Sequence, residues 1–169
     1  MKNTLSKTSK LKRVIATALF LVACAAGYGY YLITHFMVIA PPHFVAESDQ
    51  WPEPLQTLIA SVPTLQQSVR VYKYDAFVNQ KSVWRINGHA DSIRDFIVSQ
   101  SLEAVTEKHP QVQVLLDLVP ESWAAPENST STFYATRGYG SEHQEGVDLL
   151  LVVRDIESDI TFVLHECIF

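Results

Sequence analysis

The fold of this chain is decided by the stretch Val147 to Glu166, which reads VDLLLVVRDIESDITFVLHE. Residues 147–154 and 160–166 are two apolar runs rich in β-branched side chains, and such runs are typical of strands. The five residues between them, DIESD, have a length that suits a hairpin connection. The stretch therefore predicts two neighbouring antiparallel strands near the end of the chain.

Three further strands and three helices are expected before this hairpin. The strand runs are residues 69–78 (VRVYKYDAFV), 83–86 (VWRI) and 131–136. Apolar residues at helical spacing predict helices over residues 55–62, 91–97 and 110–119. Two strands, a helical block and three strands in this order indicate the α+β class. We expect one antiparallel sheet of about five strands, with the helices packed on one face.

A long uncharged segment precedes this part of the chain. No Asp, Glu, Lys or Arg occurs from Val14 to Ala46, and five Lys or Arg residues lie before it. A helix rises about 1.5 Å per residue, so a segment of this length can cross a hydrocarbon core of about 30 Å. Basic residues stay on the cytoplasmic side. The sequence predicts a single-pass anchor with its N-terminus in the cytoplasm and its C-terminal domain outside.

Cys24 offers an alternative to an uncleaved anchor. The tetrapeptide Leu21-Val22-Ala23-Cys24 resembles the lipobox of bacterial lipoproteins, which implies cleavage before Cys24 and lipidation of its sulfur. Cleavage by ordinary signal peptidase near Ala23 to Ala26 is a third interpretation. Residues 25–40 stay apolar instead of giving way to a polar tether, and this favours the uncleaved anchor. All three readings export the same domain.

These observations divide the chain into four parts. They are a cytoplasmic basic tail (1–13), a transmembrane signal anchor (14–40), a stalk (41–54) and an extracytoplasmic α+β domain (55–169).

The charge of the exported part limits its partners. Eight Lys or Arg residues and eighteen Asp or Glu residues follow Arg13, which gives a net charge of −10. Nucleic-acid binding requires basic surfaces, so no nucleic acid is expected as a partner. The expected partners are the lipid bilayer, through residues 14–40, and a protein of the cell envelope.

The loop from Arg137 to Gly146 (RGYGSEHQEG) is the first candidate site. It lies between two predicted strands, and long glycine-containing loops often carry function. Glu142 and His143 are candidate catalytic residues, because a carboxylate and an imidazole are the usual general acids and bases. Arg137 and Tyr139 are candidate ligand-binding residues of the same loop. An acidic, solvent-exposed loop without a function is the alternative interpretation.

His165 and Trp123 complete the set of candidates. His165 lies on the last predicted strand, where a buried histidine with one hydrogen bond is the common alternative to a catalytic role. Trp123 belongs to a loop and is a candidate for lining a ligand groove. The sequence lacks the two histidines four residues apart that zinc proteases carry on a helix, and we expect no metal and no cofactor.

The expected function is binding to a protein partner or scaffolding of an envelope complex, without catalysis. The chain has an anchor and a domain-sized C-terminal part but no specific catalytic motif. The alternatives are an envelope hydrolase and a small-ligand binder, each using the loop Arg137 to Gly146 and His165.

Overall fold

The computed structural model describes residues 17, 19–30, 41–75, 79–126, 130–140 and 148–168. The chain divides into two compact units, Met1–Ile39 and Ala40–Phe169. Residues 19–30 of the first unit are helical. Within the described residues, no helix has both the length and the apolar character that a membrane span requires. The predicted anchor, residues 14–40, lies partly outside those residues.

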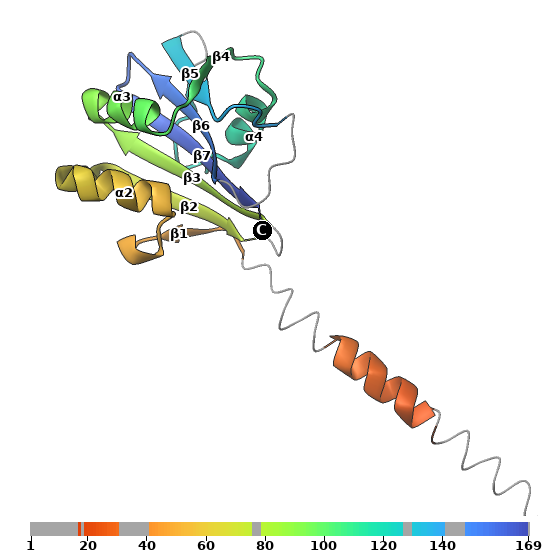
Figure 1. The fold of residues 1–169 in the computed structure, drawn as a ribbon. Coiled ribbons are helices and arrows are strands. Elements are labelled where there is room, and N and C mark those ends of the chain that lie inside the picture. Colours follow the sequence, from red (N-terminus) through yellow and green to blue (C-terminus); the bar gives the residue numbers. More distant parts are fainter. Residues whose placement is uncertain are drawn as a thin grey trace, which may run out of the picture. The chain divides into compact units, whose positions relative to one another are not determined.

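In its described residues, the second unit combines seven strands with three α-helices and two short 3₁₀ helices (Figure 1). In chain order the elements are β1 (His43–Val45), η1 (Ser48–Gln50), α2 (Glu53–Ser61), η2 (Pro63–Ser68), β2 (Val69–Asp75), β3 (Asn79–Asn87), α3 (Ala90–Ser99), β4 (Glu103–Val105), α4 (Pro110–Leu118), β5 (Ser131–Ala135), β6 (Asp148–Asp155) and β7 (Ile160–Ile168). The α+β class is therefore confirmed.

All seven strands form one antiparallel sheet in the order β1-β2-β3-β7-β6-β5-β4. The predicted hairpin lies at its centre. Strand β6 pairs with β7 along its whole length, from Asp148 with Cys167 to Asp155 with Ile160. The sheet has seven strands and not the expected five. The two additional strands, β1 and β4, have three residues each and form the two edges.

Residues 41–54, expected to form a stalk, contribute to this domain. His43 to Val45 pair with β2, and the side chain of Trp51 is buried. The Trp51 Nε1–H donates a hydrogen bond of 3.0 Å to the carbonyl oxygen of Val45. The indole thereby fixes the turn that leads from β1 into α2.

Helices cover both faces of the sheet, and the expectation of a single covered face is wrong (Figure 1). On one face, residues of α2, η2 and α3 such as Leu55, Leu65 and Ile93 pack on Trp84 and its neighbours. On the other face, α4 and the loop around Trp123 cover a second apolar cluster. The physical reason is that β6 is apolar on both sides, from Leu149 to Val153, and each side needs a cover.

Candidate functional site

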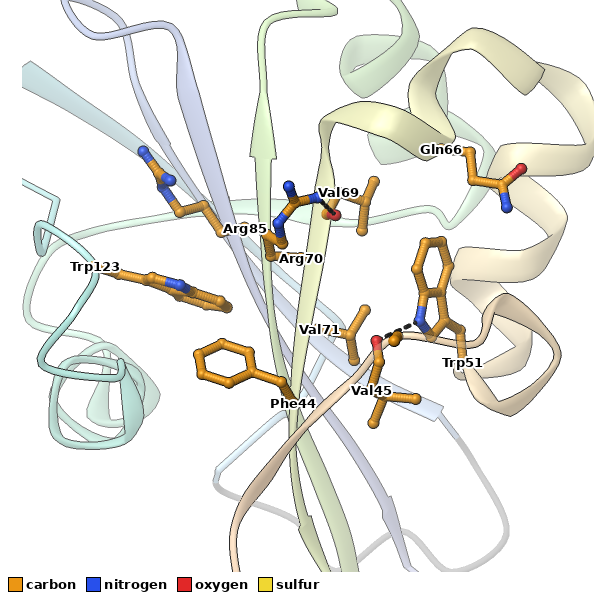
Figure 2. Close-up of a pocket in the computed structure, with 10 residues that line it drawn as sticks. Phe44, Val45, Trp51, Gln66, Val69, Arg70, Val71, Arg85 and Trp123 are labelled. Atoms are coloured by element: carbon orange, nitrogen blue, oxygen red, sulfur yellow. Dashed lines mark hydrogen bonds between the residues drawn. The ribbon is translucent and has the colours of Figure 1, made fainter.

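A pocket of about 580 Å³ opens where β1 ends beside β2 (Figure 2). Its lining comes from β1, β2 and β3 and from three segments outside the sheet. The lining residues are Phe44, Val45, Ala46, Trp51, Gln66, Val69, Arg70, Val71, Arg85 and Trp123. Among the described residues, this lining contains no Asp, Glu, His, Cys, Ser or Thr. The described lining therefore offers aromatic and cationic surface but no side chain of the types that usually act as a nucleophile or a general base.

The shortness of β1 produces this opening. The register of β1 against β2 covers only Val71 to Lys73, because the chain then turns through Ala46 into η1. In the part of the chain that the structure describes, Val69 and Arg70 have no strand partner on the side of β1. The sheet edge is therefore open beside the pocket.

Two arginines occupy directly opposed positions on the neighbouring strands β2 and β3 at this opening. Arg70 and Arg85 are direct partners in the register, so their side chains leave the same face of the sheet. The Arg70 Nη1–H donates a hydrogen bond of 2.9 Å to the carbonyl oxygen of Val69. The Arg85 Nε is shielded from solvent and has no hydrogen-bond partner among the described residues. Like charges directly opposite each other destabilise a pair of strands, so this arrangement carries a cost.

Two aromatic rings lie on the same side of the strands as Arg85. Figure 2 shows Phe44 and Trp123 there, whereas Trp51 and Gln66 lie on the other side. The ring centroids of Phe44 and Trp123 are 5.8 Å apart, and the side chain of Phe44 is 53% exposed. The indole ring of Trp123 packs against the ring of Phe162, with ring centroids 6.5 Å apart. The pocket thus presents an exposed phenyl ring beside a fixed indole ring and two guanidinium groups.

His165 belongs to a second pocket, of about 440 Å³, which Asp148, Ser82 and Cys167 also line. Its Nε2 lies 2.6 Å from Asp148 Oδ1, and its Nδ1 lies 3.4 Å from Ser82 Oγ. Ser82 Oγ also accepts a hydrogen bond of 2.8 Å from Trp84 Nε1. The three residue types of a serine-hydrolase triad therefore meet at this place.

Their exposure is the reverse of what a hydrolase needs. In such a triad the aspartate is buried and the serine hydroxyl faces the substrate. Here Ser82 is 2% exposed and accepts the Trp84 N–H, while the side chain of Asp148 is 39% exposed. Burial raises the pKa of the Cys167 thiol, and the charge of Asp148 raises it further, so this thiol is not an activated nucleophile. The cluster has the geometry of a structural polar network.

The pH dependence of stability tests this structural role. The hydrogen bond from His165 lowers the pKa of Asp148 below its usual value. A carboxyl group whose pKa is lower in the folded state stabilises the fold above its unfolded-state pKa of about 3.9, and this contribution is lost as the pH falls. We expect Asp148→Asn to lower the free energy of unfolding at pH 6, and we expect the difference from wild type to shrink progressively below about pH 4.

Urea unfolding between pH 6 and pH 2.5, followed by tryptophan fluorescence, measures this difference. Asp95→Asn, which removes an exposed carboxylate on α3, is the matched control for the loss of one negative charge. If Asp148→Asn lowers the free energy of unfolding by the same amount at every pH down to 2.5, the result would contradict the pairing of Asp148 with His165.

The remaining candidates lie in different surroundings. Tyr139 is buried and lines neither pocket, and its hydroxyl donates a hydrogen bond of 3.0 Å to Glu166 Oε2. Arg137 is exposed, with Nε 4.0 Å from Glu103 Oε1. Cys24 is exposed on helix 19–30. Glu142, His143 and the rest of the loop from residue 141 to 147 lie outside the described residues. In the described part of the chain, no three His, Cys, Asp or Glu side chains are grouped so that they could hold a metal ion.

The pocket beside β1 therefore contains Trp123 among the predicted site residues, together with an arginine pair that sequence reasoning did not identify. Arg70 and Arg85 are polar positions within two strand runs, and each is unremarkable by itself. Only the strand register places them opposite each other.

No protein-family model matches this chain, and no curated protein or solved structure shows significant similarity to it.

Proposed function

We propose that this chain is a non-enzymatic, single-pass membrane protein whose extracytoplasmic domain binds a protein partner of the cell envelope. The observation that carries the proposal is the pocket beside β1, where the described residues bring together an exposed phenyl ring, an indole ring and two guanidinium groups. The one-sided basic tail and the uncharged segment after it support the membrane topology.

The composition of the pocket fits protein recognition. Aromatic residues and arginine are enriched at the centres of protein interfaces, and a few such residues supply most of the binding energy. Phe44 is one of the exposed large apolar side chains of the domain, and it lies beside the open edge of the sheet. A partner that covers Phe44 also reaches Trp123 and the arginine pair.

Site-specific photocrosslinking tests this function. The full-length protein, in its own membrane, carries a benzophenone amino acid either at Phe44 or at Val98, an exposed apolar position on α3. We expect a discrete, light-dependent protein adduct from position 44 and none from position 98. The same adducts from both positions, or none from position 44, would contradict the proposal.

Small-ligand binding is the second candidate function. Its support is the pocket volume of about 580 Å³, which falls in the range of small-molecule sites. In that case position 44 yields no protein adduct, and a bound small molecule is recovered from the purified full-length protein by mass spectrometry.

A further inference from the structure

We propose that Arg70 and Arg85 together bind a carboxylate group on an extended, acidic segment of the protein partner. This inference rests on the proposed function, since it assigns the chemical class of the occupant of the same pocket.

The other described arginines already have carboxylate partners among the described residues, whereas Arg70 and Arg85 do not. Five arginines lie in the described part of the chain, and Arg94, Arg137 and Arg154 each have a carboxylate oxygen within 4.0 Å. Arg70 and Arg85 form no ion pair with a described residue, although the chain after Arg13 has eighteen acidic and only eight basic residues. The two unpaired guanidinium groups are thus cross-strand neighbours in an otherwise acidic domain, and an external anion would relieve their repulsion.

The surroundings of the Arg85 side chain also favour a carboxylate ligand. This side chain is half-buried, and no described residue forms an ion pair with it. Its Nε is shielded from solvent, so a ligand meets the guanidinium group at its Nη end. A carboxylate that binds end-on to the two Nη groups accepts two parallel, charge-assisted hydrogen bonds. Such a ligand gives Arg85 the countercharge that it lacks among the described residues.

The open sheet edge indicates that the carboxylate belongs to an extended peptide. Successive residues of a strand direct their N–H and C=O groups to opposite sides, so either Val69 or Arg70 directs them away from β3, towards the open edge. An extended segment that adds to a sheet edge bonds to such groups and places alternate side chains in neighbouring pockets. Phe44 and Trp123 flank the arginines and provide apolar contact for an adjacent side chain.

A lipid phosphate is the alternative anion, and two observations disfavour it. The net charge of −10 after Arg13 repels an anionic membrane surface. A headgroup also makes no use of the main-chain groups at the edge of β2.

The experiment uses the full-length protein in detergent and two blocked peptides that carry the same neutral dye. The first is acetyl-Thr-Val-Glu-Val-Thr-Val-amide, and the second has Gln in place of Glu. Fluorescence anisotropy gives the dissociation constants. We expect the glutamate peptide to bind at least about tenfold more tightly, because a charge-assisted hydrogen-bonded pair is typically worth this factor or more.

Single substitutions assign the effect to the arginine pair. Arg70→Gln and Arg85→Gln should each weaken binding of the glutamate peptide about tenfold and leave the glutamine peptide unaffected. Arg94→Gln removes the same charge from an exposed position on α3 and should change neither constant. Urea unfolding of each variant confirms that its domain is folded.

Three results would overturn the inference. They are the absence of binding by the glutamate peptide, equal affinity for the two peptides, and displacement of the glutamate peptide by sn-glycerol 3-phosphate at lower concentration than by its unlabelled form. The last result identifies a phosphate site.

If the adduct at Phe44 forms and the peptides bind with equal affinity, the proposed function stands without this inference. If the peptides discriminate and no adduct forms in membranes, the anion site stands without the proposed function.

Discussion

Replacing Trp84 with alanine should lower the free energy of unfolding of the domain by about 3–5 kcal/mol, the usual cost of truncating a buried large aromatic side chain. Trp84 is fully buried in the cluster between the sheet and helices α2 and α3. Its ring lies against Phe96 and His165, with centroids 6.4 Å and 5.6 Å away. Its indole N–H donates to Ser82 Oγ, so the substitution both opens a cavity and removes a donor from a buried hydroxyl.

Urea unfolding of the full-length protein measures this loss. Trp51 and Trp123 remain in the variant, and both lie in the unit Ala40–Phe169, so their fluorescence reports that unit. Val98→Ala, at a side chain that is 72% exposed, is the control and should change the free energy by no more than about 0.5 kcal/mol. Similar losses from both substitutions would mean that Trp84 is not in the core.

The sequence predicted the long elements of this fold and missed the short ones. Strands β5, β6 and β7 coincide closely with their predicted runs, because several alternating or continuous apolar residues mark each of them. Strands β1 and β4 have three residues each, and so short a segment shows no periodicity. Their place at the sheet edges depends on tertiary pairing, which the local sequence does not record.

The sequence of β6 indicates that both faces of the sheet are covered. The run from Leu149 to Val153 is continuously apolar, whereas a strand with one face in water alternates apolar and polar residues. This run belongs to a strand that is buried on both sides. The expectation of one covered face came from the fold class instead of from this local pattern.

The candidate site was predictable only in part. The sequence offers Trp123 as an aromatic residue that could line a binding groove, and Trp123 lines the pocket. The arginine pair depends on the pairing of Val69 with Ile86, which fixes every other pair between β2 and β3. The predicted runs 69–78 and 83–86 differ at their ends from the strands Val69–Asp75 and Asn79–Asn87. A register cannot be read from runs whose ends are misplaced.

The second large effect is expected from Lys81→Met, which should lower the free energy of unfolding by about 3 kcal/mol. Lys81 and Glu166 are cross-strand partners on β3 and β7, with Nζ 3.3 Å from Oε1. Glu166 is buried, and its other carboxylate oxygen accepts the hydroxyl of Tyr139. Removing the ammonium group leaves a buried carboxylate without this countercharge. Because Lys81 is itself partly exposed, we expect a cost at the low end of the range for buried pairs.

A second substitution in the same protein separates this electrostatic cause from a packing defect. Glu166→Gln in the Lys81→Met background should restore most of the lost stability, because the neutral amide oxygen still accepts the Tyr139 hydroxyl and no longer needs a cation. Lys108→Met, at an exposed lysine, is the control and should be nearly neutral. Burial and the neighbouring charge of Glu166 raise the pKa of Tyr139, so this phenol stays protonated and donates throughout the neutral range.

The outcome also decides the role of Tyr139, one of the ligand-binding candidates from the sequence. In the structure its hydroxyl is engaged by Glu166, and its ring belongs to the cluster that α4 covers. A stability loss from Lys81→Met that Glu166→Gln reverses identifies the three residues as a structural network under that helix. An unchanged free energy of unfolding would contradict this interpretation. It would mean that the ion pair between Lys81 and Glu166 does not stabilise the fold.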